Sequence, residues 1–298
     1  MLFELFSILV DQFSFLNVFK YLTVRTGLSM FTSMVVVFLV GGPLINYFSS
    51  NQIHDPIRDD GPREHVVKKI GTPTMGGLLV LSALVFSTVM WARLDNNYVI
   101  IVLFVTICFG GIGFIDDYLK VSRQNPKGVS SKIRLLSGFL VAAVAAYFIA
   151  TTHPDALQNR LALPIFKNLL VDLGFLFVPF AMIVIVGSAN AVNLTDGLDG
   201  LAIMPVMIAA GALGVIAYAV GRVDFTEYLD VHYVNGTGEI LILCSGIFGA
   251  GLGFLWYNAP PAAVFMGDTG SLALGGSLGA VGIITKHEIV LAITGGLF

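Results

Sequence analysis

Five aspartates stand beside long apolar stretches of this chain, and they are its best candidates for chemistry. They occur in three short motifs and are Asp116, Asp117, Asp196, Asp199 and Asp268. A charged side chain at the centre of a bilayer costs about 2.5–3.5 kcal/mol on insertion scales, so ionisable residues that close apolar segments usually have a function. The sequence therefore predicts a site if the three motifs meet on one side of a membrane.

The middle motif spaces polar side chains every three residues, at Asn190, Asn193, Asp196 and Asp199. On a helix this spacing gives a slowly drifting polar stripe on one face. Such oxygens suit a hard cation or a sugar nucleotide, because Mg²⁺ binds one or two carboxylates together with phosphate oxygens and water. The alternative is an ordinary helix end, in which Asp and Asn cap the helix and Gly197 turns the chain.

The other two motifs also have structural interpretations. Asp116 and Asp117 are explained about equally well as solvated charges at a membrane boundary, with Lys120 as a partner one turn further on. Asp268 on its own is better explained as a cap for the helix that follows it. The interpretation as a metal and phosphate site therefore depends on all three motifs reaching the same side.

Basic side chains near these motifs are candidates for phosphate binding. Lys120, Lys132 and Arg134 suit phosphates or anionic headgroups. The alternative is that these charges only fix the topology, since positive loops stay on the cytoplasmic side. Residues 59–77 combine charges with a Gly-Thr-Pro-Thr-Met-Gly-Gly run, and topology explains the charges but not that run.

Asn258 and Phe265, which precede Asp268 in the sequence, are candidates for binding a nucleobase. Phe265 offers an aromatic face for stacking, and Asn258 offers an amide that reads hydrogen bonds. The alternative for Phe265 is simple packing in the core.

Composition defines the class of protein. The chain has 298 residues, of which 56% are hydrophobic and 12% are charged, and its mean hydropathy is +0.86. These values exclude a soluble domain and a disordered chain, and they are typical of a polytopic membrane protein. The two cysteines, Cys108 and Cys244, lie inside apolar stretches, so we expect buried thiols rather than a disulfide or a metal site.

The apolar stretches are long enough to cross a bilayer, which takes about 20 residues as a helix. We predict eight spans, at 27–48, 72–92, 97–115, 133–151, 173–192, 201–220, 239–257 and 269–285. A ninth begins near Glu288 and is incomplete at Phe298. We therefore expect one all-α polytopic membrane domain over residues 1–298, incomplete at its C-terminal end.

The basic residues predict the orientation of these spans. The segments after the first and third spans hold nine of the 16 Lys and Arg residues. Because cytoplasmic loops are enriched in Lys and Arg, these segments are predicted to be cytoplasmic and the N-terminus periplasmic. The three acidic motifs end the third, fifth and seventh spans, so all five carboxylates are expected at the cytoplasmic interface.

Taken together, the motifs resemble the phospho-N-acetylmuramoyl-pentapeptide transferase family. The segments that carry the resemblance are 60–62 with 71–77, 114–118, 190–202 and 253–271. The resemblance implies ten membrane helices, a homodimer in the bacterial inner membrane and a cytoplasmic Mg²⁺ site. It also implies transfer of phospho-MurNAc-pentapeptide from UDP-MurNAc-pentapeptide to undecaprenyl phosphate, which gives lipid I and UMP. No nucleic-acid partner is expected.

The resemblance also assigns roles to residues. Asp268 would bind Mg²⁺ with help from Asn193, while Asp116 and Asp117 would face the lipid phosphate and the pyrophosphate. The implied uridine pocket consists of Gly197, Leu198, Asp199, Asn258 and Phe265, with Lys69 nearby. The implied contacts to ribose and phosphates are Thr74, Asn193 and Asp196. Asn190, Lys120 and Lys132 are further candidates for binding the substrate.

Two other functions, a related sugar-phosphate transferase and a cation transporter, are the alternatives. A transferase of GlcNAc-1-phosphate to a polyprenyl phosphate would use the same carboxylates, although residues 71–77 and 193–202 favour the muramoyl enzyme. A cation transporter would place its carboxylates near mid-bilayer on discontinuous helices rather than at one interface. Relative to the family, we expect a histidine-rich cytoplasmic loop and a last helix beyond Phe298; a non-catalytic membrane partner is the alternative if they are missing.

Overall fold

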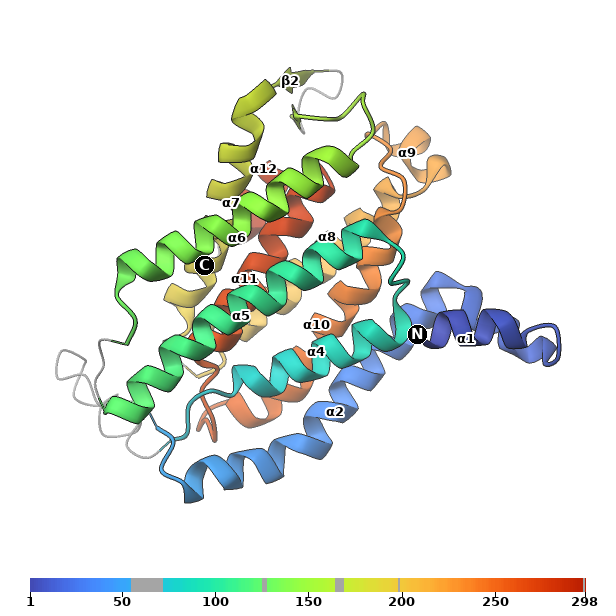
Figure 1. The fold of residues 1–298 in the computed structure, drawn as a ribbon. Coiled ribbons are helices and arrows are strands. Elements are labelled where there is room, and N and C mark those ends of the chain that lie inside the picture. The colour runs from blue at the N-terminus through green and yellow to red at the C-terminus, as the bar shows by residue number, and fades with distance from the viewer. Residues whose placement is uncertain (55–71, 125–127, 164–168, 198, 297) are drawn as a thin grey trace.

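The protein is described by a computed structural model that covers residues 1–54, 72–124, 128–163, 169–197, 199–296 and 298. Figure 1 shows that these residues form a bundle of helices with one small hairpin. The elements in chain order are α1 (Leu2–Leu9), η1 (Ser14–Lys20), α2 (Leu22–Ser50), α4 (Gly77–Trp91), α5 (Asn97–Arg123), α6 (Ser131–Thr152), β1 (Arg160–Ala162), β2 (Leu170–Asp172), η2 (Gly174–Leu176), α7 (Phe177–Thr195), α8 (Ile203–Val220), α9 (Val223–Leu229), η3 (Thr237–Glu239), α10 (Ile240–Asn258), α11 (Gly267–Ile284) and α12 (Glu288–Gly295).

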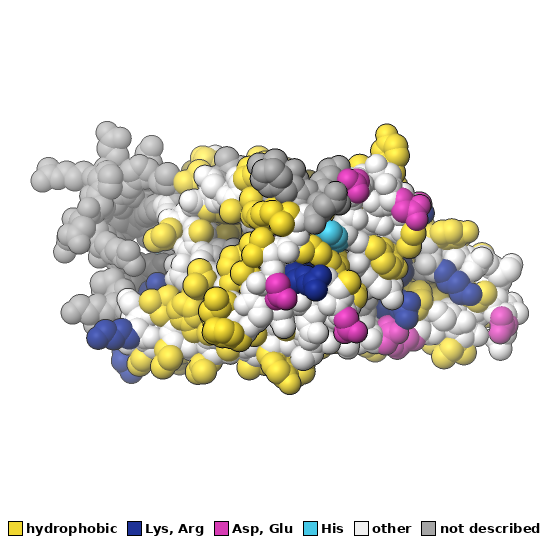
Figure 2. All heavy atoms as spheres, turned by 90° about the horizontal axis from the view of Figure 1, so that it is seen from above, with side chains coloured by type: hydrophobic (Ala, Val, Ile, Leu, Met, Phe, Trp, Pro, Cys, Tyr) yellow, Lys and Arg dark blue, Asp and Glu magenta, His cyan; other side chains and the backbone are white. Residues whose placement is uncertain are grey.

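A helix lies at each of the eight positions where the sequence predicts a span. Six of the helices among the described residues are long and apolar enough to cross a membrane. The other two are α4, which has 15 residues, and α11, which has 18. Large apolar side chains are exposed over much of the surface, and Figure 2 shows broad apolar areas with few charges between them. An all-α membrane protein is therefore confirmed, whereas the number of spans and their orientation stay predictions.

Helix α11 forms the centre of the bundle, and every residue from 269 to 284 is buried. It packs along α5 and α7 and also contacts α4 and α8 (Figure 1). Small residues make this close packing possible, since a Cβ at Gly275 would lie 2.5 Å from the Ser188 carbonyl oxygen of α7. Small side chains at membrane helix contacts allow backbones to approach each other. The glycines of α11 thus allow its close packing against α5 and α7.

Two helix ends differ from the predicted spans, and both differences shape the site. Helix α5 does not stop at residue 115 but runs two further turns to Arg123, because Lys120 neutralises Asp116 one turn along the same helix. Helix α7 stops at Thr195, and Asp196 follows as its C-cap with φ −78° and ψ 57°. The polar spacing from Asn190 to Asp199 therefore lies on a helix only as far as Asn193, and Asp196 and Gly197 occupy the cap and turn positions of the alternative interpretation.

The opposite end of the bundle is closed by a buried ion pair. The Arg25 guanidinium of α2 donates to both carboxylate oxygens of Glu239, over 2.8 and 2.6 Å. The same guanidinium donates to the carbonyl oxygen of Trp91, 3.2 Å away, and lies 4.5 Å from the centre of the Phe3 ring. These contacts tie α1, α2, α4 and η3 together at that end.

Candidate active site

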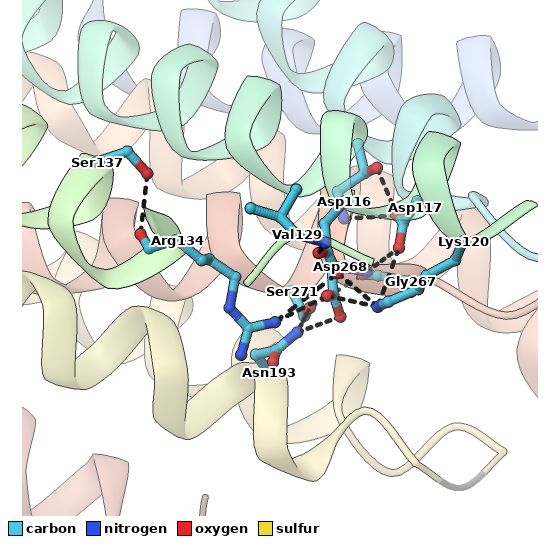
Figure 3. A network of polar contacts seen from close by, with 11 residues as sticks. Asp116, Asp117, Lys120, Val129, Arg134, Ser137, Asn193, Gly267, Asp268 and Ser271 are labelled. Carbon is cyan, nitrogen blue, oxygen red and sulfur yellow. Dashed lines mark hydrogen bonds and ion pairs between the residues drawn. The ribbon is translucent and has the colours of Figure 1, made fainter. Parts of the chain in front are cut away.

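Three of the five predicted carboxylates meet at one end of the bundle. Asp116 and Asp117 come from α5 and Asp268 comes from the first turn of α11. One oxygen from each lies within 4.8 Å of the others. Asp116 and Asp117 are each 1% exposed, whereas the Asp268 side chain retains 15% exposure. Figure 3 shows that the three side chains converge on one point between α5 and α11.

Asp116 is held between its own helix and the segment that follows. Its Oδ1 accepts a hydrogen bond from the backbone N–H of Val129, 2.6 Å away. Its Oδ2 forms ion pairs with Lys120 Nζ at 2.6 Å and with Arg134 Nη1 at 3.8 Å. That oxygen is buried and accepts no hydrogen bond from the described residues. Among the described residues, Asp116 Oδ2 is therefore held by ion pairs alone.

Asp117 faces the N-terminus of α11. Its Oδ1 accepts from the backbone N–H of Asp268 at 3.1 Å. Its Oδ2 accepts from the backbone N–H of Thr269 at 2.9 Å and from the Thr269 hydroxyl at 2.6 Å. A carboxylate at this place satisfies N–H groups that a helix leaves unpaired, and it complements the positive end of the helix dipole.

Asp268 pairs with both cations of the cluster and with an amide. Its Oδ2 lies 2.8 Å from Lys120 Nζ and 3.0 Å from Arg134 Nη1. Its Oδ1 accepts from Asn193 Nδ2 at 2.7 Å, and the same amide nitrogen donates to the Ser271 hydroxyl at 2.9 Å. The amide of Asn193 thus presents its nitrogen to Asp268 and orients that carboxylate, as Figure 3 shows.

The charges of this cluster do not balance. Among the described residues, three carboxylates face two cations, Lys120 and Arg134, in surroundings from which most water is excluded. Hard oxygen donors with surplus negative charge are what Mg²⁺ binds, and Asp268 is the carboxylate most accessible to it. The residues present therefore fit the expected metal, with Asp116 and Asp268 as candidate oxygen donors.

A second group of predicted residues joins the turn after α7 to the segment after α10. The buried amide of Asn258 accepts from the Gly200 N–H at 3.0 Å and donates to the Val264 carbonyl oxygen at 2.9 Å. Asp199 Oδ2 accepts from the Ala262 N–H at 3.2 Å. Gly200 has φ +70°, a conformation that favours glycine. These contacts bring Asp199 and Asn258, two of the residues implied to bind uridine, into one neighbourhood.

The Gly-Thr-Pro-Thr-Met-Gly-Gly run has a structural explanation in backbone pairing. The N–H of Gly76 donates to the Phe265 carbonyl oxygen at 2.8 Å, and the N–H of Phe265 donates to the Pro73 carbonyl oxygen at 2.9 Å. Gly77 packs directly against the backbone of Gly270, where a Cβ would not fit. The run thus brings buried Thr74 and half-buried Phe265 next to the start of α11.

The remaining predicted residues are placed as follows. Asn190 donates to the Val186 carbonyl oxygen of its own helix at 2.8 Å. Asp196 and Gly197 form the turn that leaves α7, and their backbone N–H groups bond to Asn193 and Thr195. Lys69 and Leu198 lie outside the described residues.

Of the two basic candidates on α6, only one reaches the cluster. Lys132 is exposed, and no contact of it with a described residue is present, whereas Arg134 pairs with Asp268. Successive helical residues point about 100° apart, so positions 132 and 134 face nearly opposite directions. The sequence predicts both residues as possible phosphate ligands, and the resemblance does not assign a role to Arg134. The helical phase of positions 132 and 134 is the signal that separates them.

Comparison with known proteins defines the class. A model described as glycosyl transferase family 4 matches residues 99–286, which includes α5, α7, α10, α11 and the three clustered carboxylates. A relative from Ruegeria sp. (strain TM1040) is named phospho-N-acetylmuramoyl-pentapeptide-transferase and is 67% identical over 291 residues, which are 97% of this chain and 81% of the relative. A relative of the same name from Pelagibacter ubique (strain HTCC1062) is 57% identical over 298 residues, which are 100% of this chain and 82% of the relative.

These matches exceed what a shared fold alone produces, since they run through nearly the whole chain. The chain belongs to the phospho-N-acetylmuramoyl-pentapeptide-transferase family. The resemblance inferred from the motifs is therefore confirmed.

Proposed function

We propose that this protein transfers phospho-MurNAc-pentapeptide from UDP-MurNAc-pentapeptide to undecaprenyl phosphate, which gives lipid I and UMP for peptidoglycan synthesis. The observation that carries the proposal is the cluster of Asp116, Asp117 and Asp268 in a chain whose relatives bear that transferase name. Transfer of GlcNAc-1-phosphate is the second candidate by chemistry, and the relatives' name disfavours it.

The reaction exchanges one phosphoester partner for another. An oxygen of the lipid phosphate attacks the phosphorus that carries the sugar, and the bond from that phosphorus to the UMP oxygen breaks. UMP leaves with the electron pair. A phosphate monoester has a second pKa near 6, so the lipid phosphate is already mostly a dianion at pH 7 and needs little help from a base. Direct attack is therefore the preferred path, and positioning with charge stabilisation supplies most of the catalysis.

The residues of the cluster divide this work. Bound Mg²⁺ would neutralise charge on the pyrophosphate, and Asp268 would hold it, with Asn193 orienting Asp268. Asp116 would face the phosphates with Oδ2, the oxygen that accepts no hydrogen bond from the described residues. Asp117 is assigned to the same catalytic group. Lys120 and Arg134 supply positive charge beside them.

The nucleotide would occupy the neighbourhood that Asn258 organises. Phe265 would stack on uracil, and Gly197, Leu198 and Asp199 would line its pocket beside Lys69. The ribose and phosphates are assigned to Asn190, Asn193, Asp196, Thr74 and Lys132. Supporting this placement, the Phe265 backbone pairs with residues 73–76, which adjoin the start of α11.

The location of the protein follows from the same proposal. We infer a single multi-pass domain in the bacterial inner membrane, with the carboxylate cluster on the cytoplasmic side and a homodimer as the assembly. The excess of Lys and Arg in the predicted loops after α2 and α5 supports this orientation. A cation transporter is disfavoured, because the carboxylates gather at one end of the bundle.

The test is release of UMP from UDP-MurNAc-pentapeptide by purified protein with undecaprenyl phosphate, with and without Mg²⁺. We expect UMP only when both substrates and the metal are present. UDP-GlcNAc replaces the donor in a parallel reaction, and efficient turnover of it would favour the second candidate. UMP release from the donor without lipid would contradict direct attack, because it indicates a phospho-enzyme.

A further inference from the structure

Thr269 makes an unusual buried contact at the start of α11. It is 1% exposed, and its hydroxyl and backbone N–H both donate to the same oxygen of Asp117, over 2.6 and 2.9 Å. The N–H of Asp268 donates to the other oxygen at 3.1 Å. Both oxygens of Asp117 are therefore used in holding the first turn of α11, on which Asp268 is carried.

The backbones around this contact leave little room for adjustment. Gly113 of α5 lies directly beneath the Asp268 carbonyl oxygen, so a side chain there would not fit. Gly267 has φ +76°, and a Cβ on it would lie 2.7 Å from Asp117 Oδ2. The turn that leads into α11 is thus pressed against α5, and Asp117 fixes its rotation about that contact.

The carboxylate of Asp268 has several side-chain partners, whereas its backbone N–H bonds to Asp117. Lys120, Arg134 and Asn193 contact the carboxylate, and each has a flexible side chain. Among the described residues, the Asp117 carboxylate alone accepts hydrogen bonds from the N–H groups of Asp268 and Thr269. Hydrogen bonds to a charged group are stronger than neutral ones. The position of Asp268 therefore depends on how firmly Asp117 is held, and the Thr269 hydroxyl is its shortest contact.

From this geometry we propose that Thr269 is a positioning residue of the active site. Its hydroxyl locks the Asp117 carboxylate onto the N-terminus of α11 and so places Asp268 for metal and pyrophosphate. The inference rests on the proposed function of Asp268. It replaces the catalytic role proposed above for Asp117, because both oxygens of Asp117 bond the first turn of α11 and so position Asp268. Neither the family match nor the motif assigns a role to Thr269.

Two substitutions separate the hydroxyl from the rest of the side chain. Thr269→Val keeps the shape and removes the donor, whereas Thr269→Ser keeps the donor and removes a methyl group. Thr285→Val is the matched control, because Thr285 is also buried, ends the same helix and donates its hydroxyl to the Val281 carbonyl oxygen. Each purified variant is compared in three measurements: steady-state UMP release, Mn²⁺ binding to metal-free protein by electron paramagnetic resonance, and thermal unfolding.

We expect Thr269→Val to lower kcat by about tenfold to a hundredfold, since small misplacements of reacting groups cost that much. Its Kd for Mn²⁺ rises about tenfold, the factor that one lost hydrogen bond to a charged group produces. The KM for undecaprenyl phosphate stays near that of wild type. Thr269→Ser and Thr285→Val retain wild-type Mn²⁺ affinity and turnover.

The opposite pattern overturns the inference. If Thr269→Val behaves like wild type and Thr269→Ser does not, the methyl group matters and the hydroxyl does not. If Asp117→Asn raises the KM for the lipid while leaving Mn²⁺ affinity unchanged, Asp117 acts on the lipid phosphate. Should Thr269→Val not fold, Thr269→Ala and Thr269→Ser decide by the same comparison. A wild-type protein without metal-dependent UMP release would instead refute the proposed function.

Discussion

The two ends of the helix bundle each bury a cluster of ionised side chains, and the clusters differ in how fully they are paired. At one end Arg25 and Glu239 form a single pair with two hydrogen bonds, of 2.8 and 2.6 Å. At the other end Lys120 and Arg134 face three carboxylates, and one buried carboxylate oxygen accepts no hydrogen bond from the described residues. The first cluster is balanced in charge, and the second has surplus negative charge.

The difference in charge balance indicates the role of each end of the bundle. A pair that is balanced in charge needs no further charged ligand, and removing one partner leaves a buried charge. A cluster with surplus carboxylate lowers its free energy when a cation binds, and such perturbed sites gather at functional positions. The Arg25 end is therefore interpreted as an anchor for the fold, and the Asp268 end as the place of chemistry.

The largest effect is expected from Asp268→Asn. Loss of the charge removes the main oxygen donor for the metal, and turnover should fall by at least about a thousandfold. UMP release measures the loss, and thermal unfolding serves as the control, with a midpoint close to that of wild type. Near-normal turnover in this variant would refute the metal role, and the Asp268 end would then no longer be distinguished from the Arg25 end as the place of chemistry.

The next effect is expected from Glu239→Gln, and it should fall on stability. The substitution leaves the Arg25 guanidinium, 3% exposed, without its partner charge, at a cost of about 3–5 kcal/mol. Denaturant unfolding in detergent measures the loss, while kcat of the remaining folded protein stays near that of wild type. The Arg25→Met and Glu239→Leu double variant should recover part of the stability. A loss of kcat without a loss of stability would contradict the role as an anchor.

Much of the fold was predictable from the sequence because membrane spans need long apolar stretches. The helices at all eight predicted positions follow from that requirement alone. Where the helices end was less predictable, because it depends on partners distant in sequence. Helix α5 continues past residue 115 with Asp116 paired to Lys120 one turn on, which is a local signal, and with Asp117 bonded to α11, which no local pattern contains. The hairpin of β1 and β2 had no clear signal either.

For the site, composition and spacing identified the carboxylates but not their individual contacts. The types of Asp116, Asp117 and Asp268 indicated a shared site, and the structure brings them within 4.8 Å. The pairing of Thr269 with Asp117 depends on how α5 and α11 pack against each other. The choice of Arg134 over Lys132 depends on the phase of α6. The first is a property of tertiary packing that one sequence does not reveal, whereas the second follows from the helical spacing of positions 132 and 134 once one of them faces the cluster.

A smaller effect is expected at Lys286, which follows the C-terminal end of α11. Burial lowers the pKa of Lys286 to about 8 from its usual 10.5, against the attraction of Glu288. The unfolded chain then binds more protons between these values, so stability rises as pH increases from about 8 to 10.5. Lys286→Met should lose that part of the rise in thermal midpoint. Exposed Lys20→Met controls for the loss of an ammonium group, and equal pH dependence in wild type and Lys286→Met would contradict the expectation.

The smallest effect is expected from Asp95→Asn, which breaks an exposed ion pair beside the anchor. Asp95 lies 2.6 Å from the Arg93 guanidinium, and their side chains are 59% and 46% exposed. The guanidinium lowers the pKa of Asp95, but water screens this pair, and exposed pairs contribute about 0.2–1 kcal/mol at most. Because the Arg93 backbone N–H still donates to Glu239, the anchor stays intact. Unfolding at low and high salt tests this, since the small loss should vanish at high salt. A loss as large as that of Glu239→Gln would mean that burial does not distinguish these two pairs.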